Sequence, residues 1–326
     1  MPLDHFVSQV HLRNFAAPEM DGMLRAIKKS DLKTFNTRSQ DVCRIQNGNT
    51  NPFLQQPRVI EEFLKGVEPC YNESVQKFRD DKIDQAAIHC VAGFVAYVIT
   101  CSPTAMRLNS GPLKAMVNAT AEVLDRSGKF SKAPAGSLGG KSLTELLADG
   151  AVSFDVDQKY PQAIGIDNIK HHVSMFGNSK WEVLLNFNDG DPYFSSDYPV
   201  AVETFDFNTP VNRVVPLAPD LAVRIVPDAA RRGAQSDLSF SNFNYTRRAQ
   251  KRQSVIALNR CLVQCAEDFV FHRDNEYWVK PFVTKNQPFR LDSVKERIQM
   301  GGRVGLAMSV RIVETPSSQP APQSRR

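Results

Sequence analysis

The feature that most constrains this chain is one apolar segment, AAIHCVAGFVAYVITC, which runs from Ala86 to Cys101. It is shorter than the about 20 residues that a membrane-spanning helix needs. It also contains His89 and is followed by Ser102-Pro103, a pair that favours the end of a helix. We therefore predict a helix buried in the core of a globular protein, and we expect no membrane association.

The composition favours an intracellular globular protein. The chain has 326 residues, of which 42% are hydrophobic and 23% charged, enough to build a sizeable core. The formal net charge of +5 permits an acidic partner without requiring one. The N-terminal sequence MPLDHFVSQVHLRNF has no basic segment followed by an apolar stretch, so we expect no export signal and a cytoplasmic location. The six cysteines show no C-x-x-C spacing and predict neither a redox motif nor a zinc site.

Helical and strand-like patterns occupy different parts of the chain. Helical periodicity predicts helices at residues 55–79, 83–101, 113–124, 142–148 and 162–176. Strand-like segments follow at 181–185, 193–194, 212–217 and 221–226, and a helix at 247–269 precedes a last strand at 277–282. This segregation predicts an α+β fold in one domain, residues 1–314, with a helical part (about 17–176) packed against a mostly antiparallel sheet (about 180–285). Residues 315–326, TPSSQPAPQSRR, are expected to be disordered.

Several short phrases of the chain occur in a distinctive order. They are His5-Phe6-Val7, Leu12-Arg13-Asn14-Phe15, Trp181 to Leu185, Phe194-Ser195-Ser196-Asp197-Tyr198-Pro199-Val200, Pro216-Leu217-Ala218-Pro219 and Val255 to Asn259. Over roughly residues 4–275 the set resembles a large, mainly bacterial family known as domain of unknown function 4238. Ser8, His11 and Tyr198 depart from the residues usual in that family. The resemblance implies a common fold and no particular activity.

Three polar residues in or near these phrases are candidate catalytic groups: His5, Glu68 and Asp197. An imidazole and two carboxylates can together transfer protons. We predict that His5 lies close to Asp197, which would raise the pKa of His5 above its reference of about 6.5 unless burial outweighs the pairing. The alternative is structural: Asp and Ser side chains in this phrase can bond to their own backbone and fix a turn.

Two other patterns suggest ligand sites but have simpler explanations. His5 and His11 would share one face of a strand and could hold a metal ion, yet His11 stands at a usual aromatic position, so we predict packing and no metal site. Residues 135–142, AGSLGGKS, nearly match the phosphate loop G-x-x-x-x-G-K-[ST], but no apolar strand precedes them. A flexible loop (127–141) followed by a helix with a Ser142–Glu145 capping box explains the same residues. The sequence identifies no cofactor.

The most uneven charge lies between Arg224 and Arg260, where basic residues interleave with aromatic ones. Such a composition suits contact with phosphates and stacked bases, and makes nucleic acid a candidate partner. The candidate nucleic-acid-binding residues are Arg231, Arg232, Arg247, Arg248, Lys251 and Arg252. Two classes of function remain: a hydrolase or nuclease that uses the His/Glu/Asp centre, and a non-catalytic interaction or regulatory protein. Convergence of the three side chains in an open cleft would favour the first class, and burial in mutual bonds the second.

Overall fold

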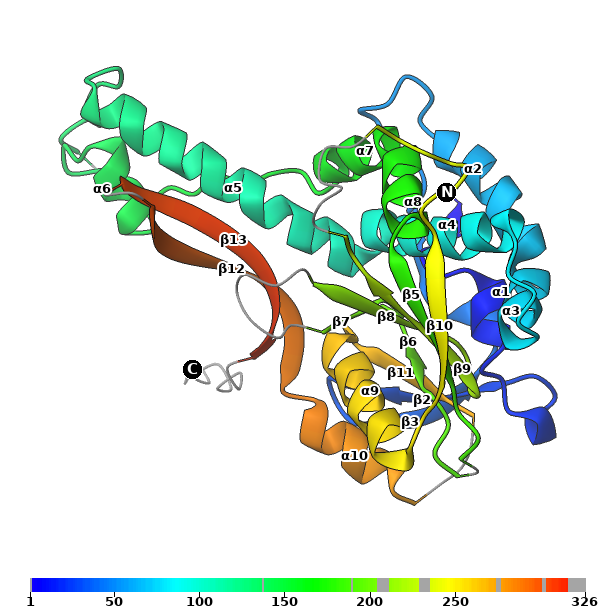
Figure 1. Cartoon of the computed structure of the whole chain (residues 1–326). Coiled ribbons are helices and arrows are strands. Elements are labelled where there is room, and N and C mark those ends of the chain that lie inside the picture. Colours follow the sequence, from blue (N-terminus) through cyan, green and yellow to red (C-terminus); the bar gives the residue numbers. More distant parts are fainter. Residues whose placement is uncertain are drawn as a thin grey trace, which may run out of the picture.

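The computed structural model describes residues 2–136, 138–188, 190–203, 211–228, 235–273, 277–300 and 303–315. Two of the candidate residues, Arg231 and Arg232, and the predicted tail from residue 316 onward lie outside these ranges. The described residues form helices and four mostly antiparallel sheets, which confirms the α+β prediction. Figure 1 shows a main body and an arm that projects from it.

Helix α4 (Gln85–Cys101) is the core helix expected from the apolar segment. It begins where the Asp84 side chain accepts a hydrogen bond from the backbone N–H of Ala87, and nearly all of its side chains are buried. Ser102 then caps the next helix, α5 (Pro103–Arg126), by accepting a hydrogen bond from the N–H of Ala105. In the part of the chain that the structure describes, no single helix is both long and apolar enough to cross a membrane.

Four shorter helices pack around α4: α2 (Val59–Val67), α3 (Tyr71–Arg79), α7 (Lys159–Asp167) and α8 (Ile169–Gly177). The helix predicted over residues 55–79 is interrupted by a 3-10 turn, η3 (Glu68–Cys70), at the break expected from Pro69. The helix predicted at 162–176 is instead two helices, which meet at Asn168. The short segment that begins the chain contains a helix of its own, α1 (Gln9–Arg13).

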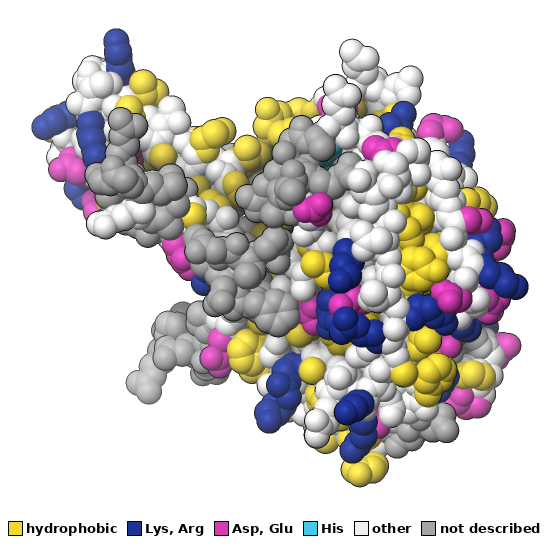
Figure 2. Space-filling model, viewed as in Figure 1, with side chains coloured by type: hydrophobic (Ala, Val, Ile, Leu, Met, Phe, Trp, Pro, Cys, Tyr) yellow, Lys and Arg dark blue, Asp and Glu magenta, His cyan; other side chains and the backbone are white. Residues whose placement is uncertain are grey.

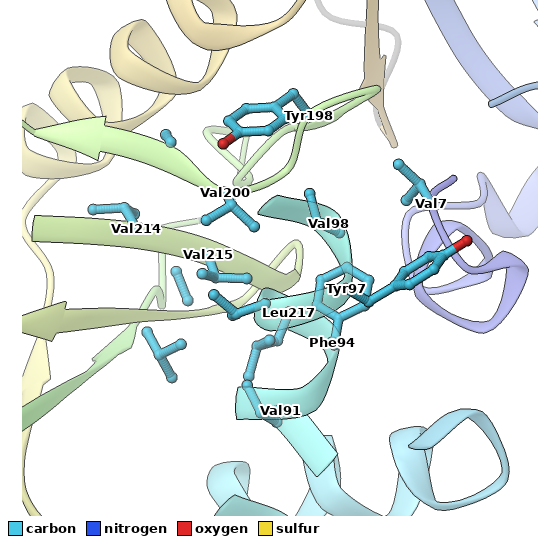
Figure 3. Close-up of a cluster of buried hydrophobic side chains, with 14 of the residues drawn as sticks. Val7, Val91, Phe94, Tyr97, Val98, Tyr198, Val200, Val214, Val215 and Leu217 are labelled. Atoms are coloured by element: carbon cyan, nitrogen blue, oxygen red, sulfur yellow. The ribbon is translucent and has the colours of Figure 1, made fainter. Parts of the chain in front are cut away.

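The largest sheet packs against α4 and has the strand order β10-β5-β9-β8-β7. Its strands are β10 (Asn244–Ala249), β5 (Lys180–Leu185), β9 (Leu221–Val226), β8 (Asn212–Ala218) and β7 (Ala201–Glu203). All neighbours are antiparallel except β10 and β5, which run parallel. Figure 3 shows Val215 and Leu217 of β8 beside Val91 and Val98 of α4, in one buried cluster.

A second sheet pairs strands from the N-terminal part of the chain with strands from its second half. Its order is β3-β2-β11-β6, with β3 (Thr34–Thr37), β2 (Leu24–Lys28), β11 (Phe269–His272) and β6 (Ser195–Ser196). Two short N-terminal strands, β1 (Leu3–His5) and β4 (Arg44–Gln46), pair separately. Four strands therefore lie before residue 47, so the predicted division into a helical half and a β-rich half is not clean.

The projecting arm consists of α5, a short helix α6 (Leu143–Ala148) and a hairpin of two strands, β12 (Phe289–Met300) and β13 (Arg303–Glu314) (Figure 1). The predicted capping box of α6 is confirmed: the Ser142 hydroxyl accepts from the N–H of Glu145, whose carboxylate accepts from the N–H of Ser142. These residues cap a six-residue helix, which accounts for the near match to a phosphate loop.

Two predictions near the C-terminus are wrong. The helix predicted at 247–269 is strand β10, helix α9 (Arg252–Cys265) and strand β11, because the first and last segments pair with strands distant in the sequence. The strand predicted at 277–282 overlaps helix α10 (Val279–Asn286). Pro281 is compatible with this helix because it lies in the first turn, where the N–H has no acceptor within the helix.

Candidate functional site

Asp197 lies between β6 and β7 with its side chain buried. One carboxylate oxygen accepts a hydrogen bond from the backbone N–H of Glu267 at 2.9 Å, and the other from those of Asp268 at 2.8 Å and Phe269 at 3.0 Å. Burial raises the pKa of Asp197 to about 6, although the three N–H donors and the Lys29 ammonium oppose the rise. The carboxylate thus holds the segment that joins α9 to β11.

The local turn around Asp197 is fixed by its neighbour instead. The Ser196 hydroxyl oxygen accepts a hydrogen bond from the backbone N–H of Tyr198 at 3.1 Å. This is the turn-fixing role predicted for polar side chains of the phrase. Ser196 therefore shapes its own turn, whereas Asp197 holds a segment that is distant in the sequence.

Lys29 occupies the same buried region and was not identified from the sequence. Its ammonium donates hydrogen bonds to three backbone carbonyls: Val263 at 2.9 Å, Ala266 at 2.6 Å and Phe289 at 2.8 Å. Burial lowers the pKa of Lys29, and nearby acidic groups including Asp197 oppose that shift. The ammonium closes the C-terminal end of α9 and ties it to the first residue of β12. A single lysine after a short strand carries no pattern that predicts this role.

His5 and Glu68 lie on neighbouring elements, at the end of β1 and the start of η3. The Ser8 hydroxyl donates a hydrogen bond of 2.5 Å to the Glu68 carboxylate. Burial lowers the pKa of His5 below its usual value and the Arg44 charge adds to this, whereas hydrogen bonding to the backbone of Gln40 and the Glu68 charge oppose it. The predicted rise in the pKa of His5 is therefore wrong: burial lowers it, and the carboxylate that opposes the shift is Glu68 and not Asp197.

Of the three candidate catalytic residues, His5 and Glu68 influence each other, whereas Asp197 bonds to other residues. Glu68 is close enough to His5 to influence its pKa. Asp197 instead bonds to residues 267–269, and within the described ranges no hydrogen bond joins it to His5 or Glu68. Nor do the described residues gather three or more His, Cys, Asp or Glu side chains where a metal ion could be held.

The N-terminal segment is tied to the Phe194–Val200 phrase through His11. One ring nitrogen of His11 lies 2.8 Å from the Tyr71 hydroxyl and the other 2.8 Å from the Ser195 hydroxyl. The ring stacks on Phe94 with centroids 4.7 Å apart and is fully buried. Burial lowers its pKa to about 3, so it is neutral at pH 7. The packing role predicted for His11 is confirmed, whereas a shared strand face with His5 is wrong because His11 lies on α1.

Three of the four described basic candidates in the C-terminal half form ion pairs with acidic side chains. The closest pairs join Arg247 to Asp81 at 3.1 Å, Arg248 to Glu182 at 3.5 Å and Arg252 to Asp191 at 2.6 Å. Lys251 is exposed directly before α9. Figure 2 shows basic and acidic side chains intermixed on this face of the body. The segment is thus less uniformly positive in space than in the sequence.

A cleft of about 560 Å³ opens where the chain after α1, helix α3, the β8–β9 turn and the end of β11 meet. Its polar lining combines two guanidinium groups, one carboxylate and three side-chain amides. The lining residues are Asn14, Ala16, Pro18, Asn72, Val75, Gln76, Arg79, Ala218, Pro219, Asp220 and Arg273. Sequence analysis did not identify the cleft, because its residues are spread over about 260 positions of the chain.

A family model described as a protein of unknown function, DUF4238, matches residues 4–276. The chain belongs to this family. No curated protein and no solved structure matches the chain. The DUF4238 match contains the whole lining of the cleft as well as His5, Glu68 and Asp197, and it ends before α10 and the β12–β13 hairpin. Membership in DUF4238 establishes a family and assigns no activity.

Proposed function

We propose that the protein acts by binding a ligand or partner, and that His5, Glu68 and Asp197 do not catalyse a reaction. The observation that carries this proposal is the geometry of Asp197. Both of its carboxylate oxygens accept backbone hydrogen bonds inside the core. A general base must reach the proton of a bound substrate, and a carboxylate held in this way has no access to one.

The other polar groups that link the N-terminal segment to the body support the same proposal. Glu68 accepts a short hydrogen bond from Ser8, and His11 joins Tyr71 to Ser195. These contacts satisfy polar side chains that would otherwise be costly to bury. Polar groups that are bonded to one another in this way stabilise the fold and are not available for catalysis. This supports the second of the two function classes considered from the sequence, a non-catalytic interaction or regulatory protein.

The test is a comparison of activity and stability in the same variants. Purified wild-type protein is assayed with phosphomonoester, phosphodiester and single-stranded RNA substrates, with and without Mg²⁺. We expect no turnover by the wild type, and a lower midpoint of urea unfolding for Asp197→Ala. Asp31→Ala, which alters an exposed turn, is the control and should unfold like the wild type. Turnover that disappears in a folded Asp197→Ala variant would overturn the proposal.

Nucleic acid remains a second candidate ligand, supported by the exposure of two basic side chains. The side chains of Arg248 and Arg252 are 58% and 66% exposed, although each lies near a carboxylate. Fluorescence anisotropy with labelled single-stranded RNA at low salt tests this candidate. If it is correct, Arg248→Glu together with Lys251→Glu weakens binding and reduces its salt dependence. Binding that is unchanged in this double variant would exclude the basic segment as the contact.

A further inference from the structure

The cleft described above has the location and size of a small-molecule site. Four segments that are distant in the sequence meet there, which is typical of ligand sites formed between structural elements. Its volume of about 560 Å³ falls within the about 300–1,000 Å³ usual for ligand pockets. Val75, Ala218 and Pro219 are buried and provide an apolar floor, while the amides of Asn72 and Gln76 are exposed at its wall.

The charges that line the cleft are unequal. Among the described residues of the lining, two guanidinium groups, Arg79 and Arg273, accompany one carboxylate, Asp220, so these residues carry one net positive charge. Burial raises the pKa of Asp220, but the hydrogen bonds and the charge of Arg79, a backbone hydrogen bond and the charge of Arg273 together outweigh burial and keep the pKa below its usual value. Asp220 is therefore ionised at neutral pH, and the net charge of the lining includes it.

Arg79 is held in place before any ligand arrives. Its Nε and one terminal nitrogen donate to Asp220 at 2.8 and 2.9 Å, and the other terminal nitrogen donates to Gln76 at 2.7 Å. The backbone carbonyl of Arg79 in turn accepts a hydrogen bond from Arg247 at 3.0 Å. The hydrogen bonds to Asp220 and Gln76 use three of the five N–H groups of the Arg79 guanidinium. A guanidinium fixed in this way can bind an oxyanion at a smaller cost in side-chain entropy.

We propose that this cleft binds a small polar molecule through a phosphate group, and this inference rests on the proposed binding function. Planar guanidinium groups suit the oxygens of a phosphate. The cleft is larger than a bare phosphate requires, and its amides can donate to and accept from hydroxyl or ring atoms of the rest of the molecule. Asp220 is a positioning residue in this arrangement, because it fixes Arg79 and does not contact the ligand.

Calorimetry with inorganic phosphate, ribose 5-phosphate and adenosine monophosphate tests the proposal on the full-length protein. We expect both phosphorylated compounds to bind more tightly than inorganic phosphate. Asn72→Asp is the decisive variant because it cancels the net positive charge of the lining. Asn72 is exposed in the first turn of α3, where an added carboxylate is compatible with the helix dipole and the fold. Its affinity for both compounds should fall by about tenfold or more.

Gln253→Glu is the matched control, because it adds the same charge to an exposed position in the first turn of α9, outside the cleft. It should bind like the wild type, whereas Arg273→Gln should weaken binding as Asn72→Asp does. Failure of the wild type to bind either phosphorylated compound at millimolar concentration would overturn the inference. The inference would also be overturned if the Asn72→Asp and Arg273→Gln variants bound the compounds as tightly as the wild type. Such a result would indicate an adventitious ion only. Hydrolysis of a compound bound in the cleft would instead overturn the proposed function and leave the site in place.

Discussion

His11 links the N-terminal segment to two other parts of the chain and must be neutral to do so. Its folded pKa of about 3 lies below the unfolded value of about 6.5, so the unfolded chain binds a proton that the folded protein excludes. The contribution of His11 to stability is complete above pH 6.5 and is lost as the pH falls toward 3. Between pH 7 and pH 5 we expect a loss of about 2 kcal/mol from this residue alone.

The measurement is urea unfolding of the wild type and His11→Gln at several pH values. Gln does not titrate, so the difference in unfolding free energy between the two proteins isolates the effect of His11. We expect that difference to shrink on going from pH 7 to pH 5. A constant difference across this range would mean that His11 is protonated in the folded protein or is not buried.

Asp197 should respond to pH in the opposite direction. Its folded pKa of about 6 lies above the unfolded value of about 3.9, so its favourable contribution is complete below pH 3.9 and is lost as the pH rises through 6. The Asn variant does not titrate, and its NH₂ group would face backbone N–H donors at Asp268 or Glu267. We expect Asp197→Asn to lower stability by about 1–3 kcal/mol at pH 7, and by more at pH 5. Equal losses at both pH values would contradict the raised pKa.

At the level of elements, a close contact at Gly111 and Pro112 helps to join α5 to β12 in the arm. Pro112 lies inside α5 and has no N–H, so the carbonyl of Leu108 lacks its usual helical donor. The Ser293 hydroxyl from β12 supplies that hydrogen bond at 2.9 Å. Gly111 makes the approach possible, since a Cβ there would lie 2.9 Å from the Cβ of Ser293. The Gly-Pro pair thus forms a docking point for the hairpin.

We expect Gly111→Ala to weaken the attachment of the hairpin and lower the thermal midpoint, because neither backbone can easily move to admit the methyl group. Hydrogen exchange should show faster exchange in β12 and β13 than in the wild type. Gly66→Ala in α2 is the matched control, since its Cβ would meet nothing within 4 Å. A helical Gly→Ala change without such a contact should stabilise by about 0.5–1 kcal/mol. Equal effects of the two substitutions would contradict the docking role of Gly111.

Elements that depend on local signals could be predicted from the sequence. The apolar run of α4 and the Ser142–Glu145 capping box of α6 are examples, because their determinants lie within a few residues. The segment Asn244–Ala249 could not be, since its pairing with β5 depends on residues more than 50 positions away. The prediction that His5 lies close to Asp197 placed the N-terminal segment beside the Phe194–Val200 phrase. The hydrogen bond that joins these two segments runs from His11 to Ser195, and it could not be predicted because His11 was expected on a strand and lies on helix α1.

For the molecule as a whole, residues 2–16 form part of the core and are not an appendage to it. Strand β1 pairs with β4, and His11 bonds to Tyr71 of the helical part and to Ser195 of the second sheet. One side of the cleft is also formed by this segment, through Asn14 and Ala16. The Asn14 side chain donates a hydrogen bond to the carbonyl of Leu217 in β8, which fixes that side against the largest sheet. Stability and the proposed ligand site therefore depend on the same short segment.

Deletion of residues 1–16 should abolish cooperative folding. It removes the side chains of Phe6, Val7, Leu12 and Phe15, all of them buried. At about 1.5–3 kcal/mol for each, the loss is about 6–12 kcal/mol, close to the about 5–15 kcal/mol that stabilises a typical domain. Thermal unfolding followed by circular dichroism measures the effect. Leu3→Ser, at a side chain that is 49% exposed, should melt within a few degrees of the wild type. A truncated protein that melts cooperatively near the wild-type midpoint would show that the segment is an appendage, since the remaining chain would then form the core without it.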